Sequence, residues 1–207
     1  MNHSECLAKE SIIIRIVAIA VLTGWPFLGN CEEITPAGTP TYSLWEGPGK
    51  AWEADVQPVE LGVKFRTDVA GEVTAIRFYR DMPIESGYVV RLWNSTGDLL
   101  GNGASYEGQG PTPGWQTVQI FPPIHIDAGQ TYVASYYASN GRYSASNGFF
   151  ARQAPSNGPL HALANEEDGN GVYVYGPGGG FPTQSHQATN YWVDVVFKPT
   201  PALPAPD

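Results

Sequence analysis

Apolar and polar residues alternate along many stretches of this chain, a pattern with the two-residue period of a β-strand. The clearest stretch is 59–66, where the odd-numbered positions from Val59 to Phe65 are apolar and the even-numbered positions from Glu60 to Arg66 are polar or glycine. The pattern predicts a strand with one face buried in a core and the other face in water.

Seven further stretches have strand character, and residues suited to turns separate several of them. They are residues 76–80, 88–93, 99–106, 115–121, 131–137, 172–175 and 191–197. The last stretch is apolar on both faces, which favours a central position in its sheet. Helical periodicity does not interrupt the series. We therefore predict an all-β fold, an antiparallel two-sheet β-sandwich that is jelly-roll-like and has about eight strands.

Aromatic residues alternate with Gly and Asn over residues 138–190. A segment of this length inside a compact domain predicts a long ordered loop system held on the β-scaffold, where it covers one edge or one mouth of the sandwich. Loops on a rigid scaffold are where binding surfaces usually lie. This segment is therefore the first place to look for function.

The two ends of the chain have the character of export and linker segments. Residues 16–29 are apolar, follow Lys9 and Arg15, and are shorter than the roughly 20 residues of a spanning helix, which indicates a signal peptide. An uncleaved N-terminal anchor helix is the alternative. We expect an exported protein of the extracellular space or cell envelope. The predicted segments are a signal peptide or lipoprotein signal at 1–31, a spacer at 32–42, the sandwich domain at 43–198 and a Pro-rich tail at 199–207.

Cys31 is the only cysteine beyond the predicted signal, because Cys6 lies upstream of the apolar stretch. Residues 28–31, with the sequence LGNC, resemble a bacterial lipobox in the Leu and the Cys and depart from it in Asn30. If the resemblance holds, Cys31 is the site of lipidation, and acyl chains tether the domain to a membrane. An incidental cysteine near an ordinary cleavage site is the other interpretation.

Acidic residues outnumber basic ones by 20 to 11, which gives a net charge of −9. Phosphate backbones are repelled by this charge, and no cluster of Lys and Arg overrides it, so a nucleic-acid partner is excluded. The chain is long enough to bury a core without a disulfide or a metal. We accordingly expect no cofactor for the fold beyond a structural calcium ion, considered next.

The segment 166–170, with the sequence EEDGN, offers hard oxygen ligands on a flexible backbone. Glu166, Glu167 and Asp168 are the candidate ligands of a structural calcium ion. The segment does not match an EF-hand loop, and a solvated acidic loop is the simpler interpretation.

The sequence has no recognisable catalytic constellation. It contains no Gly-x-Ser-x-Gly elbow, and its histidines do not stand in a zinc-binding spacing. Asp194 is a carboxylate inside the final apolar stretch, so it requires a fixed partner, and an ion pair or hydrogen bond with an Arg is favoured over catalysis. An enzyme acting on glycans stays open as an alternative, because two carboxylates can meet in space from any spacing in sequence.

The aromatic residues are the main functional signal. Flat rings stack on the apolar faces of sugars, while amides and hydroxyls satisfy sugar hydroxyls. Packing of the same rings against the sheet is the competing interpretation for any one of them. The candidate ligand-binding residues are Tyr143, His161, Tyr173, Tyr175, Phe181, His186 and Trp192. Tyr173 and Tyr175 share one face of a short strand by the two-residue period.

Several motifs occur in an order that resembles a known family. They are PVELGVKFR at 58–66, IRFY at 76–79, GWQTV at 114–118, AG at 128–129 with YVASY at 132–136, NGPL at 157–160 and NYWVDVVF at 190–197. In these motifs the chain is similar to the bacterial domain-of-unknown-function 4082 family, over roughly residues 42–198. The resemblance implies an exported β-sandwich module and carries no chemistry onto particular residues.

These observations favour a non-catalytic binding module for a carbohydrate or cell-surface glycan. A structural or adhesive surface protein that binds another protein is the first alternative, and a glycan-active enzyme is the second. Membrane association is expected only through a lipid anchor or an uncleaved signal.

Overall fold

The computed structural model describes residues 39–45, 52–81, 87–105, 110–167 and 169–201. The predicted signal, Cys31 and the end of the Pro-rich tail lie outside the described residues. Within these ranges no helix is long and apolar enough to cross a membrane.

The described residues form an all-β structure, with one short 3-10 turn, η1 (Asn165–Glu167). The strands are β1 (Trp52–Ala54), β2 (Val59–Thr67), β3 (Gly71–Arg80), β4 (Tyr88–Asn94), β5 (Leu99–Ser105), β6 (Gly114–Ile126), β7 (Tyr132–Ala138), β8 (Arg142–Ser144), β9 (Ser156–Asn157), β10 (Leu160–Ala162), β11 (Val172–Tyr175), β12 (Gln184–Ser185) and β13 (Val193–Pro199). All eight predicted strands are present, and β1, β8, β9, β10 and β12 are short additions to them.

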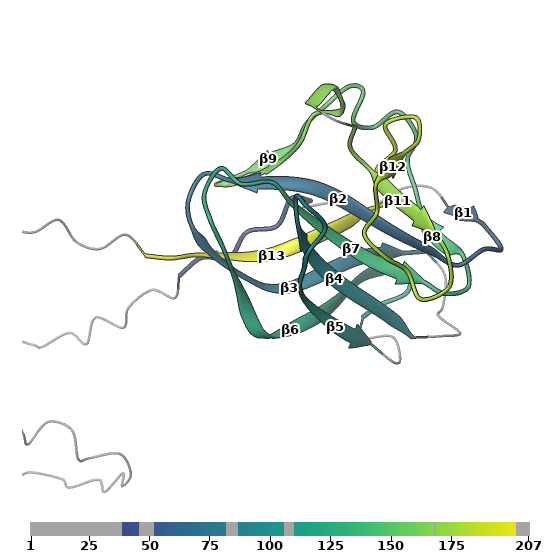
Figure 1. Ribbon diagram of the computed structural model, residues 1–207, viewed down its shortest axis with the longest axis horizontal. Helices are drawn as coiled ribbons and strands as arrows, with labels where there is room; N and C mark the ends of the chain where they lie inside the picture. The colour runs from purple at the N-terminus through teal and green to yellow at the C-terminus, as the bar shows by residue number, and fades with distance from the viewer. Residues whose placement is uncertain (1–38, 46–51, 82–86, 106–109, 168, 202–207) are drawn as a thin grey trace, which may run out of the picture. The chain divides into compact units, whose positions relative to one another are not determined.

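Two antiparallel sheets form a sandwich, which confirms the predicted fold class (Figure 1). The large sheet has the order β12-β11-β2-β7-β4-β5, and β9 and β10 extend it beside β2. The small sheet has the order β13-β3-β6, and β1 pairs separately with β8. The chain passes from one sheet to the other between β2 and β3, between β3 and β4, and on either side of β6.

The core lies between the two sheets. Phe78 of β3 stacks on Tyr136 of β7, with ring centroids 4.4 Å apart and an interplanar angle of 11°. Phe65 of β2 is also fully buried. Burial of such rings is the main source of stability in a sandwich, because each removes a large apolar area from water.

The segment 138–190 covers one edge of the large sheet, as the sequence predicts. Both β10 and β11 pair with the edge of β2 that faces away from β7. In Figure 1, β1, β8, β11 and β12 gather at the right-hand end of the sandwich. The segment is thus partly built of short strands, which use the backbone of β2 to satisfy their own hydrogen bonds.

Two expectations about strand environment are wrong. The final strand, β13, is at the edge of the small sheet instead of its centre. Tyr42 forms an antiparallel bridge to Phe197 along that edge. On β2, Glu60 and Gly62 are buried, although the alternation predicts that they face water.

Candidate functional site

A pocket of about 490 Å³ lies at the end of the large sheet where β2 begins. It draws residues from β2, β8, β11 and the segments that precede β2 and β13. Four of the seven predicted ligand-binding residues meet in it. The described lining residues are Asp55, Val59, Leu61, Tyr143, Asn147, Tyr173, Tyr175, His186, Thr189 and Tyr191. We call this cavity the tyrosine pocket.

Strand β11 supplies two of the four tyrosines. Tyr173 pairs with Leu61 and Tyr175 pairs with Val59 in the antiparallel register of β11 and β2. Side chains at paired positions lie on the same face of a sheet, so both rings point to the face of the buried Leu61 and Val59. Tyr175 is 42% exposed and Tyr173 is half-buried. The shared face that the two-residue period predicts is confirmed.

The four rings follow one another as a chain of edge-to-face contacts. The ring centroids are 5.5 Å apart for Tyr175 and Tyr173, 6.3 Å for Tyr173 and Tyr191, and 5.8 Å for Tyr191 and Tyr143. Edge-to-face pairs of this kind are favoured by the quadrupole of each ring. Each ring therefore helps to fix the orientation of the next, and the pocket wall is ordered before any ligand arrives.

Asp55 adds a carboxylate to the pocket, and no signal in the sequence singled it out. The Tyr175 hydroxyl donates a 2.5 Å hydrogen bond to Asp55 Oδ2. This bond lowers the pKa of Asp55, with help from the backbone amides of Val56 and Gln57, and it raises the pKa of Tyr175 above its usual value. Asp55 is held in place through its own amide, which donates to the carbonyl of Gly141 at 2.9 Å. Gly141 has a φ of 69°, which favours glycine.

The polar side of the pocket comes from a loop after β12. His186 and Thr189 lie on this loop, which includes Gln187 and Ala188 with a φ of 49° each. Backbone hydrogen bonds of 2.9 to 3.0 Å tie residues 187–190 to residues 146–150. Gly171 has no room for a Cβ atom against the carbonyl of Thr189. Non-glycine residues in the left-handed region are kept there by surrounding structure and cluster at functional sites.

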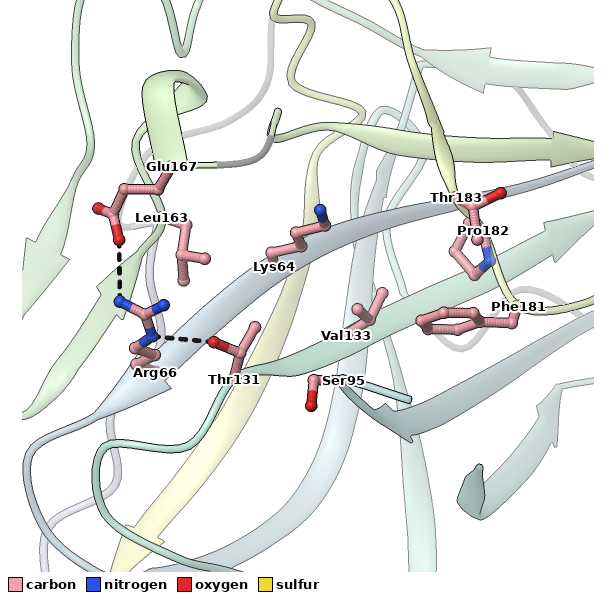
Figure 2. A pocket seen from close by; sticks show the side chains of 10 residues that line it. All are labelled: Lys64, Arg66, Ser95, Thr131, Val133, Leu163, Glu167, Phe181, Pro182 and Thr183. Atoms are coloured by element: carbon pink, nitrogen blue, oxygen red, sulfur yellow. Dashed lines mark hydrogen bonds and ion pairs between the residues drawn. The ribbon is translucent and has the colours of Figure 1, made fainter. Parts of the chain in front are cut away.

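A second concavity, of about 420 Å³, lies on the face of the large sheet that points away from the core. We call it the outer groove (Figure 2). Phe181 and Pro182 form one side, Leu163 and Glu167 form the other, and Lys64 rises between them. Phe181 packs against Trp93, with centroids 5.7 Å apart. Phe181 therefore lines the outer groove and not the tyrosine pocket, although Phe181 and three of the pocket tyrosines are all predicted as ligand-binding residues.

A buried ion pair lies under the loop that carries Phe181. Arg91 pairs with Glu60, and Ser135 Oγ donates a 2.6 Å hydrogen bond to Glu60 Oε1. Burial raises the pKa of Glu60 to about 7, against the opposing effects of Ser135 and of the Arg91 charge. Arg91 also donates to the carbonyl of Gly178 at 2.9 Å, and the Gly178 amide donates to the Tyr137 hydroxyl at 2.8 Å. These bonds hold the loop over the outer face of β2. The loop shields Glu60 from solvent, which explains why this side chain is buried.

His161 and Trp192 lie apart from both concavities. The ring nitrogens of His161 are 2.8 Å from Ser156 Oγ and 2.7 Å from Asp68 Oδ2, beside the far end of β2. Trp192 packs against Trp45 and Phe149, at centroid distances of 5.7 and 5.4 Å. The structure shows packing contacts for Trp192 and polar partners for His161.

Glu166 and Glu167 of the acidic segment lie in η1, and Glu167 has a basic partner. Glu167 makes a 2.8 Å ion pair with Arg66, whose Nε donates to Thr131 Oγ1 at 2.9 Å. Glu166 is exposed, and Asp168 lies outside the described residues. Within the described part of the chain, no three His, Cys, Asp or Glu side chains are grouped so that they could hold a metal ion.

Asp194 has the fixed Arg partner that the sequence predicts. It is fully buried and pairs with Arg77, with Nη2 2.7 Å from Oδ2. Its two oxygens also accept hydrogen bonds from the amides of Leu44 and Trp45, at 2.7 and 3.1 Å. A carboxylate that has these partners and no exposure to solvent stabilises the fold.

The fold and the tyrosine pocket define this protein as a β-sandwich domain with a concave aromatic site. The chain belongs to the family described as domain of unknown function (DUF4082), whose model matches residues 45–193. The match confirms the resemblance seen in the sequence motifs. No curated protein has significant similarity to the chain.

Proposed function

We propose that this protein is an exported, non-catalytic binding module that recognises a carbohydrate at the cell surface through the tyrosine pocket. The observation that supports this proposal is the convergence of four tyrosine rings with the polar side chains of Asp55, Asn147, His186 and Thr189 around one cavity. Rings and polar groups in this mixture match the two kinds of surface that a sugar presents.

The size of the tyrosine pocket agrees with this proposal. A cavity of about 490 Å³ lies within the range of roughly 300 to 1,000 Å³ that is typical of small-molecule sites. The rings are held by one another and by the sheet, so little ordering is needed on binding. Preorganisation of this kind improves affinity because it lowers the entropic cost of association.

The pocket is favoured over the outer groove because its aromatic wall is larger. The outer groove contains a single ring, that of Phe181, among its described lining residues. Lys64 and Arg66 also line it, and Glu167 neutralises Arg66. A glycan site built from stacking rings therefore fits the tyrosine pocket better.

A glycan array followed by titration calorimetry tests the proposal. Replacement of a ring that anchors a ligand costs about 2 kcal/mol or more, roughly a thirtyfold loss of affinity. We expect this loss for Tyr175→Ala and Tyr173→Ala, and no loss for the matched change Phe181→Ala in the outer groove. Melting temperatures of the three variants separate lost contacts from lost folding.

Two results would count against a binding module that uses the tyrosine pocket. One is the absence of any ligand in a broad glycan screen. The other is a ligand whose affinity depends on Phe181 and not on the tyrosines. The first result would favour a structural or adhesive protein that contacts another protein.

A further inference from the structure

The tyrosine pocket combines aromatic rings with one carboxylate and one imidazole. Of its described lining residues, Asp55 carries the carboxylate, His186 carries the imidazole, and none is a Lys or an Arg. The Tyr175 hydroxyl and the Val56 and Gln57 amides all donate to this carboxylate, and they favour its charged form, since their effect is to lower its pKa. The pocket therefore presents negative charge at neutral pH.

Tyrosine rings add to this negative character. The face of an aromatic ring carries a partial negative charge, and a cation within about 6 Å of its centre is attracted to it. Four such rings line one cavity beside the Asp55 carboxylate. The net charge of −9 on the whole chain gives a field of the same sign, which raises the local concentration of cations.

The outer groove offers the contrasting environment on the same molecule. It is lined by the side chains of Lys64 and Arg66, and Arg66 forms an ion pair with Glu167. Lys and Arg side chains thus line the outer groove, whereas none is among the described residues that line the tyrosine pocket.

We propose that the tyrosine pocket binds a glycan unit that carries an ammonium group, an amino sugar with a free amine. The ammonium group lies near the Asp55 carboxylate and the tyrosine faces, and the sugar ring packs on Tyr173 and Tyr175. This inference rests on the proposed glycan-binding function and adds the charge of the ligand to it. A hydrogen-bonded ion pair in a partly enclosed site gives both affinity and selectivity over the uncharged sugar.

The test compares two ligands of the same length, an oligomer of glucosamine and an oligomer of N-acetylglucosamine. Acetylation removes the positive charge and keeps the sugar ring, so the decisive change is made in the ligand and does not depend on the folding of a variant. At pH 7 and low salt, titration calorimetry on the whole protein should show at least tenfold tighter binding of the glucosamine oligomer. The preference should decrease as salt is added, because salt screens the charges.

Three variants assign the preference to the pocket. Asp55→Asn should remove most of the tenfold preference, whereas Asp127→Asn, which changes a carboxylate that is 73% exposed on a remote turn, should leave it unchanged. Tyr173→Ala should weaken the binding of the glucosamine oligomer.

Equal or tighter binding of the acetylated oligomer would overturn the inference. If Tyr173→Ala still weakens that binding, the proposed glycan-binding function survives without the charge preference. Binding of neither oligomer would also overturn the inference, while the glycan array decides the proposed function separately. A glucosamine preference that Asp55→Asn leaves intact would show that another site provides it.

Discussion

Arg77 and Asp194 form an ion pair between neighbouring strands of the small sheet, with Arg77 Nη2 2.7 Å from Asp194 Oδ2. The same carboxylate accepts hydrogen bonds from the backbone amides of Leu44 and Trp45. One side chain therefore joins β3, β13 and the segment that precedes the sandwich. Because β13 is the edge of its sheet, this junction holds the covering segment in place and protects the edge.

Removal of the Asp194 carboxylate should destabilise the protein. Asp194→Ala leaves the Arg77 charge and the backbone amides of Leu44, Trp45 and Val195 without this acceptor, and breaking one partner of a buried pair typically costs about 3 to 5 kcal/mol. Urea unfolding should show a loss of this size, and Asp127→Ala, which changes an exposed carboxylate, should stay within about 0.5 kcal/mol of the unsubstituted protein. A stable Asp194→Ala protein would contradict the structural role.

The aromatic core can be tested with two matched phenylalanines. Phe78 is fully buried against Tyr136, whereas Phe121 is 92% exposed. Phe78→Ala should lower the free energy of unfolding by about 3 to 5 kcal/mol, because the change removes a buried ring and leaves a cavity. The same chemical change at Phe121 should have little effect. Similar losses of unfolding free energy at both positions would contradict the burial of Phe78 in the core.

Stability should fall as the pH rises from about 5 to about 7. The pKa of Glu60 is raised from 4.5 to about 7 by burial, so the folded protein keeps a proton in this range that the unfolded chain has released. Folding is then favoured at the lower pH, and the stabilisation is lost as the pH rises through the folded pKa. The expected change in the free energy of unfolding is on the order of 1 kcal/mol or more.

Glu60→Gln is the control for this pH dependence, because Gln keeps the shape and an acceptor oxygen but does not titrate. The difference between the two unfolding curves isolates Glu60 from Asp194, whose pKa burial raises to about 6 in the same direction. Parallel curves for the two proteins between pH 5 and 7 would mean that Glu60 is fully ionised when folded.

Much of the fold could be predicted because the alternation of apolar and polar residues in a strand is a local feature of the sequence. The eight predicted strands are all present, since alternation indicates which face of a strand meets a core, but β3 begins five residues before the predicted 76–80 and β6 ends five residues after the predicted 115–121. Alternation does not report what covers the other face. Glu60 is buried because a loop more than 100 residues later in the sequence folds over β2, and the edge of β13 is paired with Tyr42. Both arrangements depend on contacts between segments far apart in the sequence.

The candidate site was predictable to a similar extent. Tyr173 and Tyr175 were found together because one strand presents them on one face. Asp55 was missed because it meets Tyr175 across 120 positions in the sequence. Trp192 was grouped with the binding residues because of its aromatic ring, whereas the structure packs it against Trp45. An aromatic residue in a loop gives no local sign of whether its ring faces a pocket or a core.

Export and lipidation can be tested with one substitution outside the described residues. Growth with a labelled fatty acid should mark the unsubstituted protein, and Cys31→Ser should remove the label, because a diacylated cysteine needs the thiol. Equal labelling of the two proteins, or labelling of neither, would exclude lipidation at Cys31. Recovery of the mature protein outside the cytoplasm tests export itself.

Binding of a glycan in the tyrosine pocket should change the chemical shifts of the tyrosine ring protons. The chain has 11 tyrosines, so selective ring labelling gives a spectrum in which single Tyr→Phe changes assign each signal. Addition of the ligand found on the array should shift the signals of Tyr143, Tyr173 and Tyr175 and leave the buried core ring of Tyr136 unchanged. If saturating ligand shifts the signal of none of these three tyrosines, the glycan does not bind in the tyrosine pocket.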